Sequence, residues 1–326
     1  MEDYNIKTRV VGVDISTERT TYAIVDIRGN ILAEDSFPTV DYPDVNNFVT
    51  ALSEKIVTLV EANGGYETIR SIGVSSPSAS SVSGCLENAA NLPWKGVVPL
   101  AAMLRDRLGL AVGLSNDAHI SALGEYTFGC AHGMKNFIII SLGVGIGSCF
   151  FSAGNEHQGH LGYAGEFGHT CVSDGGRECG CGHRGCLESY VGAVGIVHTA
   201  EELMSESDAP SLMRDLEKLS PRTIAECCDK GDEIAQEVYR RTGYMLGLGL
   251  ANYASIIDPE AIILTGGISH AGKWLIDPVY ESFESHVFGN MRGKIKIITS
   301  RLDDRERDVL GASALAWSVP EYSLFK

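Results

Sequence analysis

Long apolar runs and positive charge are both scarce in this sequence of 326 residues. No segment approaches the roughly 18 consecutive apolar residues of a membrane span, and the first residues (MEDYNIKTRV) are too polar for a secretory signal. Lys and Arg total 26 against 42 Asp and Glu, a net charge of −16 that opposes binding to nucleic acid and anionic membranes. We therefore expect a cytoplasmic protein with no nucleic-acid or membrane partner.

The length and the apolar content fit a soluble α/β enzyme of two domains, with 44% hydrophobic residues and 37 glycines. The nine cysteines come without an export signal, which favours reduced thiols or metal ligands over disulfides. Five are scattered in apolar or helical surroundings and are expected to be core thiols: Cys85, Cys130, Cys149, Cys227 and Cys228. The other four cluster between Cys171 and Cys186.

The segment from Gly165 to Glu188 (GEFGHTCVSDGGRECGCGHRGCLE) is rich in metal-binding side chains and poor in apolar ones. His169, Cys179, Cys181 and Cys186 form a Cys₃His set that suits tetrahedral Zn²⁺, and four protein ligands would make the ion structural. Cys171 and His183 are competing ligands, and free reactive thiols are the alternative to a metal site.

Two segments of the chain share the same predicted order of strand, turn and strand. A strand over 8–13 is followed by Asp14, a hydroxyl-rich turn over 16–20 and further strands over 21–26 and 31–37. A strand over 137–141 leads into the glycine-rich stretch Leu142–Gly147 (LGVGIG) and an extended segment over 148–153. The repetition indicates an internal duplication, one copy per domain. Asp14 could hold Mg²⁺ and phosphate, or merely cap its turn.

Residues that could act in catalysis or bind phosphate follow two further predicted strands. A strand over 110–114 delivers Asn116 and Asp117 to the start of a helix, where Asp117 is either a functional carboxylate or the helix cap. A strand over 260–264 ends in Gly266 and Gly267, which can cradle a phosphate or form a simple turn.

Hydrophobic periodicity predicts the remaining elements. Helices are expected over 44–61, with Asp44 as the N-cap, and over 99–108, 190–205, 222–230, 232–254 and 309–317; further strands are expected over 69–74 and 294–299. The loop over 75–84 (SSPSASSVSG) is either a flexible connector or a substrate rim.

These motifs together resemble the ROK family of sugar kinases. The most specific are Gly165–His169 (GEFGH) and Cys179–Glu188 (CGCGHRGCLE), supported by Asp14, Asn116–Glu125 (NDAHISALGE), Leu142–Gly147, Asp258–Gly267 and Leu310–Ala312. The resemblance implies an α/β fold of the actin-like ATPase (ribonuclease H-like) type, with two α/β lobes and a cleft between them. It places the small lobe at 1–118, the large lobe with the zinc loop at 119–307, and a C-terminal helix returning to the first lobe at 308–326. A homodimer is also implied.

The resemblance further implies ATP-dependent phosphorylation of a hexose or N-acetylhexosamine hydroxyl, with Asp117 as general base and Mg²⁺ accompanying ATP. It assigns sugar binding to Asn116, Glu166, His169 and Glu188. His169 would ligate structural Zn²⁺ through one ring nitrogen and contact sugar through the other. Nucleotide binding is assigned to Asp14, Gly143, Gly145, Gly147, Gly266 and Gly267.

The sequence departs from the family pattern in its nucleotide-facing segments. Ser16–Arg19 replaces two glycines of the first phosphate turn and adds the charge of Glu18, and Val144 stands where a hydroxyl residue is usual. Thr265 replaces a glycine, and the loop at 77–81 lacks a carboxylate. These changes predict altered nucleotide affinity. A second hypothesis is therefore a sugar sensor without catalysis, since the family includes repressors with an added N-terminal winged helix. Only residues 1–7 precede the first expected strand, so direct DNA binding is not expected.

Overall fold

The computed structural model describes residues 7–320 apart from 90 and 161, with backbone only at 304 and 305. The chain divides into two compact units. The first comprises residues 1–132, 160–162 and 301–326, and the second comprises residues 133–159 and 163–300. Each unit is an α/β body with its own sheet and its own buried core.

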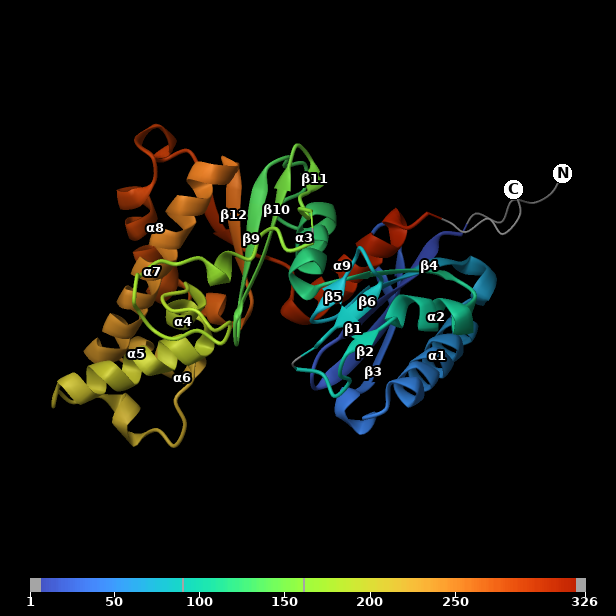
Figure 1. The fold of residues 1–326 in the computed structure, drawn as a ribbon, viewed down its shortest axis with the longest axis horizontal. Helices are drawn as coiled ribbons and strands as arrows, with labels where there is room; N and C mark the ends of the chain where they lie inside the picture. The colour runs from blue at the N-terminus through green and yellow to red at the C-terminus, as the bar shows by residue number, and fades with distance from the viewer. Residues whose placement is uncertain (1–6, 90, 161, 321–326) are drawn as a thin grey trace. The chain divides into compact units, whose positions relative to one another are not determined.

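The sheet of the first unit has the strand order β3-β2-β1-β4-β8 (Figure 1). Its strands are β1 (Arg9–Ile15), β2 (Arg19–Asp26), β3 (Ile31–Pro38), β4 (Ile69–Ser75) and β8 (Ala111–Ser115). The first three strands form an antiparallel meander, whereas β4 and β8 run parallel to β1.

The sheet of the second unit repeats this plan with the order β11-β10-β9-β12-β13. Its strands are β9 (Phe137–Leu142), β10 (Ile146–Ser152), β11 (Asn155–Glu156), β12 (Ala261–Thr265) and β13 (Lys296–Thr299). Again an antiparallel meander is followed by two parallel strands. All five residues of β12 are buried, as in a parallel strand covered on both faces. The matching order is what an internal duplication predicts, and it agrees with the predicted actin-like class.

The helices of the first unit begin with α1 (Val45–Ala62), whose predicted N-cap is confirmed because the Asp44 carboxylate accepts from the Asn47 amide at 3.0 Å. The other elements are η1 (Thr39–Asp41), η2 (Tyr66–Thr68), α2 (Leu100–Leu108), α3 (Asp117–Phe128), α9 (Asp304–Ser318), and a small sheet of β5 (Ala79–Ser80), β6 (Cys85–Glu87) and β7 (Val97–Val98). The small sheet occupies part of the segment expected to be a loop.

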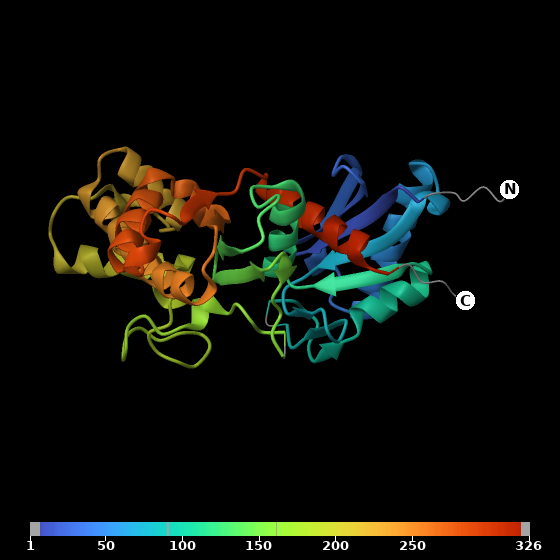
Figure 2. The ribbon, with the colours of Figure 1, turned by 90° about the horizontal axis from the view of Figure 1, so that it is seen from above.

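Helix α9 lies against the sheet of the first unit along a row of three glycines (Figure 2). Gly12 of β1 faces Gly73 of β4, and Gly73 faces Gly113 of β8, so the three form one line across the strands. A methyl group on Gly73 would lie 1.9 Å from the Ala312 carbonyl oxygen, and one on Gly12 would lie 2.4 Å from that of Val309. The missing side chains therefore let the helix approach the sheet backbone directly.

Helix α3 also belongs to the first unit, because it packs on α9 through two further glycines. A methyl group on Gly311 would lie 2.0 Å from the Ile120 carbonyl oxygen, and one on Gly124 would lie 3.0 Å from that of Arg307. The first unit consequently extends to residue 132, past the boundary expected after residue 118. It also takes in the returning helix at the end of the chain, which begins at Asp304.

The second unit carries a helical layer on its sheet. The elements are η3 (Phe167–His169), α4 (Glu188–Val191), α5 (Ala193–Glu206), η4 (Leu212–Asp215), α6 (Pro221–Asp229), α7 (Glu233–Ile257), η5 (Gly267–Ala271), α8 (Lys273–His286) and η6 (Gly289–Met291). Helices α7 and α8 lie side by side (Figure 1), and they pack closely because Gly243 and Gly247 of α7 face the backbone of α8. No helix among the described residues combines the length and apolar content needed to cross a bilayer.

Candidate functional site

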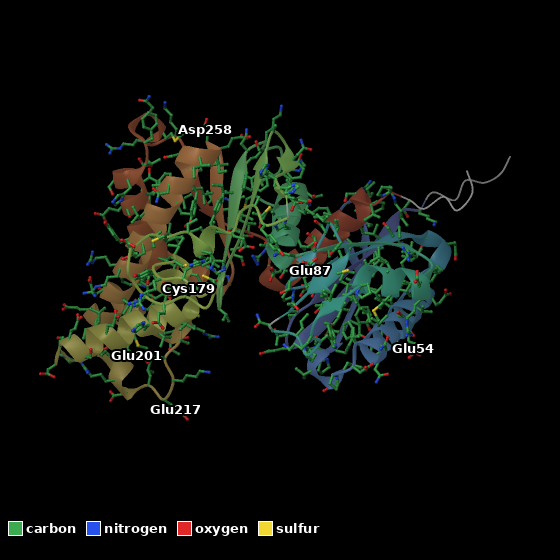
Figure 3. The ribbon with its side chains drawn as sticks, in the orientation of Figure 1. Glu54, Glu87, Cys179, Glu201, Glu217 and Asp258 are labelled. Atoms are coloured by element: carbon green, nitrogen blue, oxygen red, sulfur yellow. The ribbon has the colours of Figure 1, made fainter. Side chains whose placement is uncertain are left out.

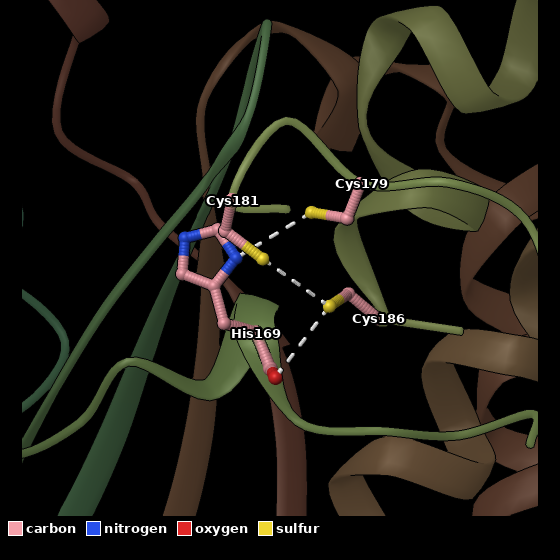
Figure 4. A group of neighbouring side chains, drawn as sticks. All are labelled: His169, Cys179, Cys181 and Cys186. Atoms are coloured by element: carbon pink, nitrogen blue, oxygen red, sulfur yellow. Dashed lines mark hydrogen bonds between the residues drawn. The ribbon is translucent and has the colours of Figure 1, made fainter. Parts of the chain in front are cut away.

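The four side chains predicted to bind zinc come together in the second unit. One ligand atom from each of His169, Cys179, Cys181 and Cys186 lies within 4.8 Å of the others (Figure 4). The Cys179 Sγ is 3.7 Å from the His169 Nδ1, and the Cys181 Sγ is 3.6 Å from the Cys186 Sγ. Tetrahedral Zn²⁺, with bonds of about 2.3 Å to sulfur and about 2.1 Å to nitrogen, would separate its ligand atoms by about 3.6 to 3.8 Å. The donor set therefore fits zinc in both chemistry and spacing.

The two competing ligands, Cys171 and His183, are not members of this group. The backbone of the loop explains the difference for His183. Its carbonyl oxygen accepts from the Cys179 amide at 2.9 Å, and the Gly182 amide donates to the Cys179 carbonyl at 3.0 Å, which closes a tight turn. Gly182 sits at φ +90°, a conformation that favours glycine. The turn folds Cys179 and Cys181 back toward His169.

The thiols of the group influence one another. Burial and hydrogen bonds from neighbouring thiols raise the pKa of Cys186 to about 12, and burial also raises the pKa of Cys179. A hydrogen bond with the His183 backbone instead lowers the pKa of Cys181. Three sulfurs held this close resist ionising together, and a divalent cation among them would relieve that resistance.

An aromatic stack fixes the short helix η3, which contains His169. Phe167, in the same short helix η3, stacks on Tyr253 of α7 with ring centroids 4.0 Å apart. The Tyr253 hydroxyl donates to the Phe167 carbonyl at 2.5 Å and lies 2.6 Å from the Thr170 hydroxyl. The His169 Nδ1 faces the sulfurs, and its other ring nitrogen is directed away from them (Figure 4). This orientation leaves Nε2 for another partner.

Glu188 connects the metal group to the glycine loop. Its Oε2 accepts from the Ile146 amide at 2.9 Å, and the Cys179 thiol lies 3.8 Å from its Oε1. A methyl group on Gly145 would lie 2.5 Å from Oε2, so that glycine admits the carboxylate. Cys179, labelled in Figure 3, accordingly lies beside α4, which begins at Glu188. Glu166, by contrast, is exposed at the start of η3.

Arg177 ties the cysteine-containing loop to the helices behind it. Its guanidinium lies 4.9 Å from the Tyr190 ring centroid and pairs with Glu202 at 2.5 Å. It also donates to the Gly195 carbonyl at 3.0 Å and to the Thr199 hydroxyl at 3.0 Å. The loop is thus ordered by direct protein contacts in addition to any metal.

A cavity of about 580 Å³ adjoins the glycine loop in the second unit. Two predicted nucleotide residues, Gly143 and Gly267, line it together. No sequence motif indicated its other lining residues, which include Ser220, Arg222, Tyr239 and His270. Cavities of this size commonly hold small ligands.

The other predicted nucleotide glycines, Gly145, Gly147 and Gly266, are not among the residues that line this cavity. Gly266 sits at φ +82°, and a methyl group there would lie 2.5 Å from the Leu142 carbonyl oxygen. Gly147 pairs with Ser141 in the β9–β10 ladder. Val144, at the exposed tip of the loop, is 82% exposed. Thr265 is buried, and its Oγ1 has no hydrogen-bond partner among the described residues.

In the first unit the structure brings Asp14 and Asp117 close enough for their charges to interact. Desolvation by the surrounding protein raises the pKa of Asp14 to about 6; the Ser75 hydroxyl offsets part of this rise and the Asp117 charge adds to it. Desolvation also raises the pKa of Asp117, against a 2.8 Å hydrogen bond from the Ala118 amide. Ser75 is buried, and its Oγ makes no hydrogen bond of regular geometry. Two carboxylates and a hydroxyl of this kind suit a hard cation such as Mg²⁺.

The structure decides which residues cap the neighbouring turn and helix. Asn116 caps α3, since its side chain accepts from the His119 amide at 3.1 Å, and Asp117 is the first residue of the helix. At the first turn, Ser16 supplies the closing contacts: its hydroxyl donates to the Arg19 carbonyl at 2.8 Å. Asp14 lies within β1. Neither aspartate is therefore needed as a cap.

The turn that replaces two glycines is closed and occupied by side chains. The Ser16 amide donates to the Arg19 carbonyl at 3.0 Å, and the Arg19 guanidinium reaches the Ser36 hydroxyl at 2.5 Å. Thr17 and Glu18 are exposed at its tip. Arg19 is therefore held against β3, while Glu18 remains at the surface of the turn.

Comparisons with known proteins agree with this geometry. Residues 10–319 match the sequence profile described as the ROK family. The glucokinase of Streptomyces coelicolor is 32% identical over 94% of this chain and 96% of its own length. The crystal structure of a ROK family glucokinase from Streptomyces griseus in complex with glucose and AMPPNP superposes with a TM-score of 0.77 at 29% identity, covering 95% of this chain and 99% of that one. A xylose repressor of Caldicellulosiruptor bescii is 26% identical over 96% of this chain and 80% of its own length.

Proposed function

Because this chain belongs to the ROK family, we propose that it transfers the γ-phosphoryl group of ATP to a hydroxyl of a hexose or N-acetylhexosamine. Sugar phosphorylation of the glucokinase type is supported by the similarity to glucokinases over nearly the whole chain.

One observation carries the proposal: in the second unit the same short loop lines the cavity and holds the Glu188 carboxylate. Gly143 lines the cavity of about 580 Å³, and three residues later the Ile146 amide holds the Glu188 carboxylate at 2.9 Å. In our proposal the cavity takes the nucleotide, while Glu188 and the free His169 nitrogen take sugar hydroxyls. The loop thereby fixes the phosphoryl donor relative to the acceptor, which is the main requirement of phosphoryl transfer.

Asp117 is the proposed general base. The sugar oxygen attacks the γ-phosphorus, the bond to the bridging oxygen of ADP breaks, and the hydroxyl proton passes to an Asp117 oxygen. The desolvation that raises the pKa of this carboxylate makes it a stronger base, and capping of α3 by Asn116 leaves it available. Asn116 then contributes to sugar binding beside it.

The ions have separate proposed roles. Asp14 helps to hold Mg²⁺ accompanying ATP, which would neutralise charge on the phosphates. The Cys₃His group holds structural Zn²⁺, and its contribution is to keep His169 and Glu188 oriented. Glu166, exposed near His169, is a further proposed contact to sugar.

A coupled ADP-release assay over a panel of hexoses and N-acetylhexosamines tests the proposal. We expect turnover with at least one sugar and a loss of roughly 10²- to 10⁴-fold in kcat for Asp117→Asn, with folding verified by circular dichroism. Absence of turnover with every sugar, or full turnover by the variant, would refute it.

A second candidate function is sugar sensing without catalysis. It is favoured by the exposed Glu18, which adds negative charge to the turn that binds phosphate in the family pattern. Calorimetry separates the two candidates. Binding of a sugar together with failure to bind MgATP would support the sensor, whereas binding of both ligands supports the kinase.

A further inference from the structure

Cys171 lies directly opposite a proposed zinc ligand. It forms an isolated antiparallel bridge with Cys186, whose backbone it faces across the loop. The Val172 amide donates to the Gly185 carbonyl at 2.8 Å, and the Leu187 amide donates to the Thr170 carbonyl at 3.0 Å. Both hydrogen bonds join the neighbours of the two cysteines. Cys171 and Cys186 are therefore a non-hydrogen-bonded pair of an antiparallel ladder.

This kind of pair is suited to a disulfide. Cα atoms in such a pair are about 4.5 Å apart, and opposed side chains project to the same side of the ladder. A disulfide requires Cα atoms about 4.4 to 6.8 Å apart. The Cys171 Sγ is also directed at the facing strand, because a methyl group on Gly185 would lie 3.3 Å from it. A pair of this type therefore has the backbone spacing that a bond between the two sulfurs needs.

We propose that Cys171 and Cys186 are an oxidant-sensitive dithiol, which a peroxide converts to a disulfide that withdraws Cys186 from the metal group. The second part of this inference rests on the proposed zinc site. Cys171 is exposed and meets the oxidant first, whereas Cys186 is 1% exposed and resolves the product. An accessible thiol beside a resolving cysteine is the usual arrangement of a redox-sensitive site.

The chemistry balances with hydrogen peroxide as the oxidant. The Cys171 thiolate attacks one peroxide oxygen, the O–O bond breaks, and hydroxide leaves a sulfenic acid on Cys171. The Cys186 sulfur then attacks the Cys171 sulfur; the S–S bond forms, the S–O bond breaks and a second hydroxide leaves. Two electrons pass from the two sulfurs to the two oxygens. One proton from the Cys171 thiol and one from Cys186 or solvent convert both hydroxides to water.

The disulfide would disturb the proposed sugar-binding residues next to the metal group. With Cys186 removed, His169, Cys179 and Cys181 remain as three ligands, too few for the closed tetrahedral site. His169 and Glu188 both contact Cys179, so they would lose their fixed positions. Oxidation is expected to release metal and to lower sugar binding, and reduction in the presence of zinc should restore both.

Trypsin digestion of the full-length protein without reduction tests the pair directly. Cleavage after Lys135, Arg177, Arg184 and Arg214 places Cys171 in peptide 136–177, Cys179 and Cys181 in peptide 178–184, and Cys186 in peptide 185–214. After peroxide treatment we expect mass spectrometry to show 136–177 joined to 185–214, with fragmentation placing the bond at Cys171. A chromogenic chelator should report loss of one zinc per chain in parallel.

Two variants act as controls. Cys171→Ser should lack the joined peptides and lose zinc much more slowly at the same peroxide dose, while its activity before treatment is unchanged. Cys85→Ser, altered in the other unit, should behave as the parent protein. A bond found only between Cys186 and peptide 178–184, or equally fast zinc loss from Cys171→Ser, would overturn the inference. Joined peptides in a protein that purifies without metal would support the dithiol and refute the zinc site alone.

Discussion

Replacing Asp14 with asparagine should stabilise the unliganded protein while weakening its interaction with MgATP. Asparagine has nearly the same shape but no charge to desolvate. The pKa of Asp14 is raised from 3.8 to about 6, chiefly by desolvation. A rise of about two units corresponds to about 3 kcal/mol of free energy of unfolding, at about 1.36 kcal/mol per unit. That value is an upper limit, because Asp14 keeps some solvent contact.

The direction of the pH dependence follows from the raised pKa. Between pH 3.8 and about 6 the unfolded chain releases this proton before the folded protein does. The free energy of unfolding of the parent protein therefore falls as the pH rises through this interval. The Asp14→Asn variant lacks this term, so its stability advantage should be small near the lower end and complete above about pH 6.

Urea denaturation at several pH values, with and without MgATP, measures both effects. The Asp35→Asn variant is a matched control in which the replaced carboxylate has a pKa shift of the opposite sign. Hydrogen bonds from the Ser36 amide and the Tyr22 hydroxyl lower the pKa of Asp35. That control should not gain stability at neutral pH. MgATP should stabilise the parent protein and have little effect on Asp14→Asn. If Asp14→Asn is no more stable than the parent protein at about pH 8, the role assigned to desolvation is wrong.

Three further predictions concern packing, metal and nucleotide. Gly73→Ala should lower the free energy of unfolding by about 1–3 kcal/mol or more, because its methyl group would strike the Ala312 carbonyl, whereas Gly289→Ala has open space and should change it little in thermal unfolding. We expect elemental analysis to find one zinc per chain in the parent protein and none in Cys181→Ser, which should also have a KM for sugar raised more than its KM for ATP; retained zinc would contradict the ligand set. Glu18→Thr should lower the KM for MgATP by removing negative charge from the first turn, and an unchanged KM would place that turn away from the phosphates.

The sequence predicted the features that depend on near neighbours along the chain. The Asp44 cap and the helix after it follow from local spacing and are confirmed. The grouping of the four metal ligands could also be predicted from the cysteine spacing. The tight turn at Gly182 that brings them together depends only on glycines nearby in the sequence. Whether Asp117 caps its helix could be decided only from the structure, in which Asn116 is the cap.

Contacts between segments that are distant in the chain could not be predicted from the sequence. The hydrogen bond from the Ile146 amide to Glu188 joins residues 42 positions apart, so hydrophobic periodicity could not predict it. Tyr239 reaches the cavity wall from α7, where its spacing is that of a core residue. Gly12, Gly73 and Gly113 each stood inside a predicted strand, where an isolated glycine often marks a close backbone approach. That signal was present, but only the strand register shows that the three form one row.

The glycine row also governs when the first unit can finish folding during synthesis. Its strands come from residues 9–115, whereas α9, which packs on the sheet along the three glycines, comes from residues 304–318. A chain emerging from the ribosome therefore carries an uncovered sheet until all of the second unit has been made. The usual order, in which the amino-terminal domain is completed first, is reversed in this molecule. Until then the nascent first unit exposes the apolar side chains of the sheet, including Val10 and Val25, that later pack against α9.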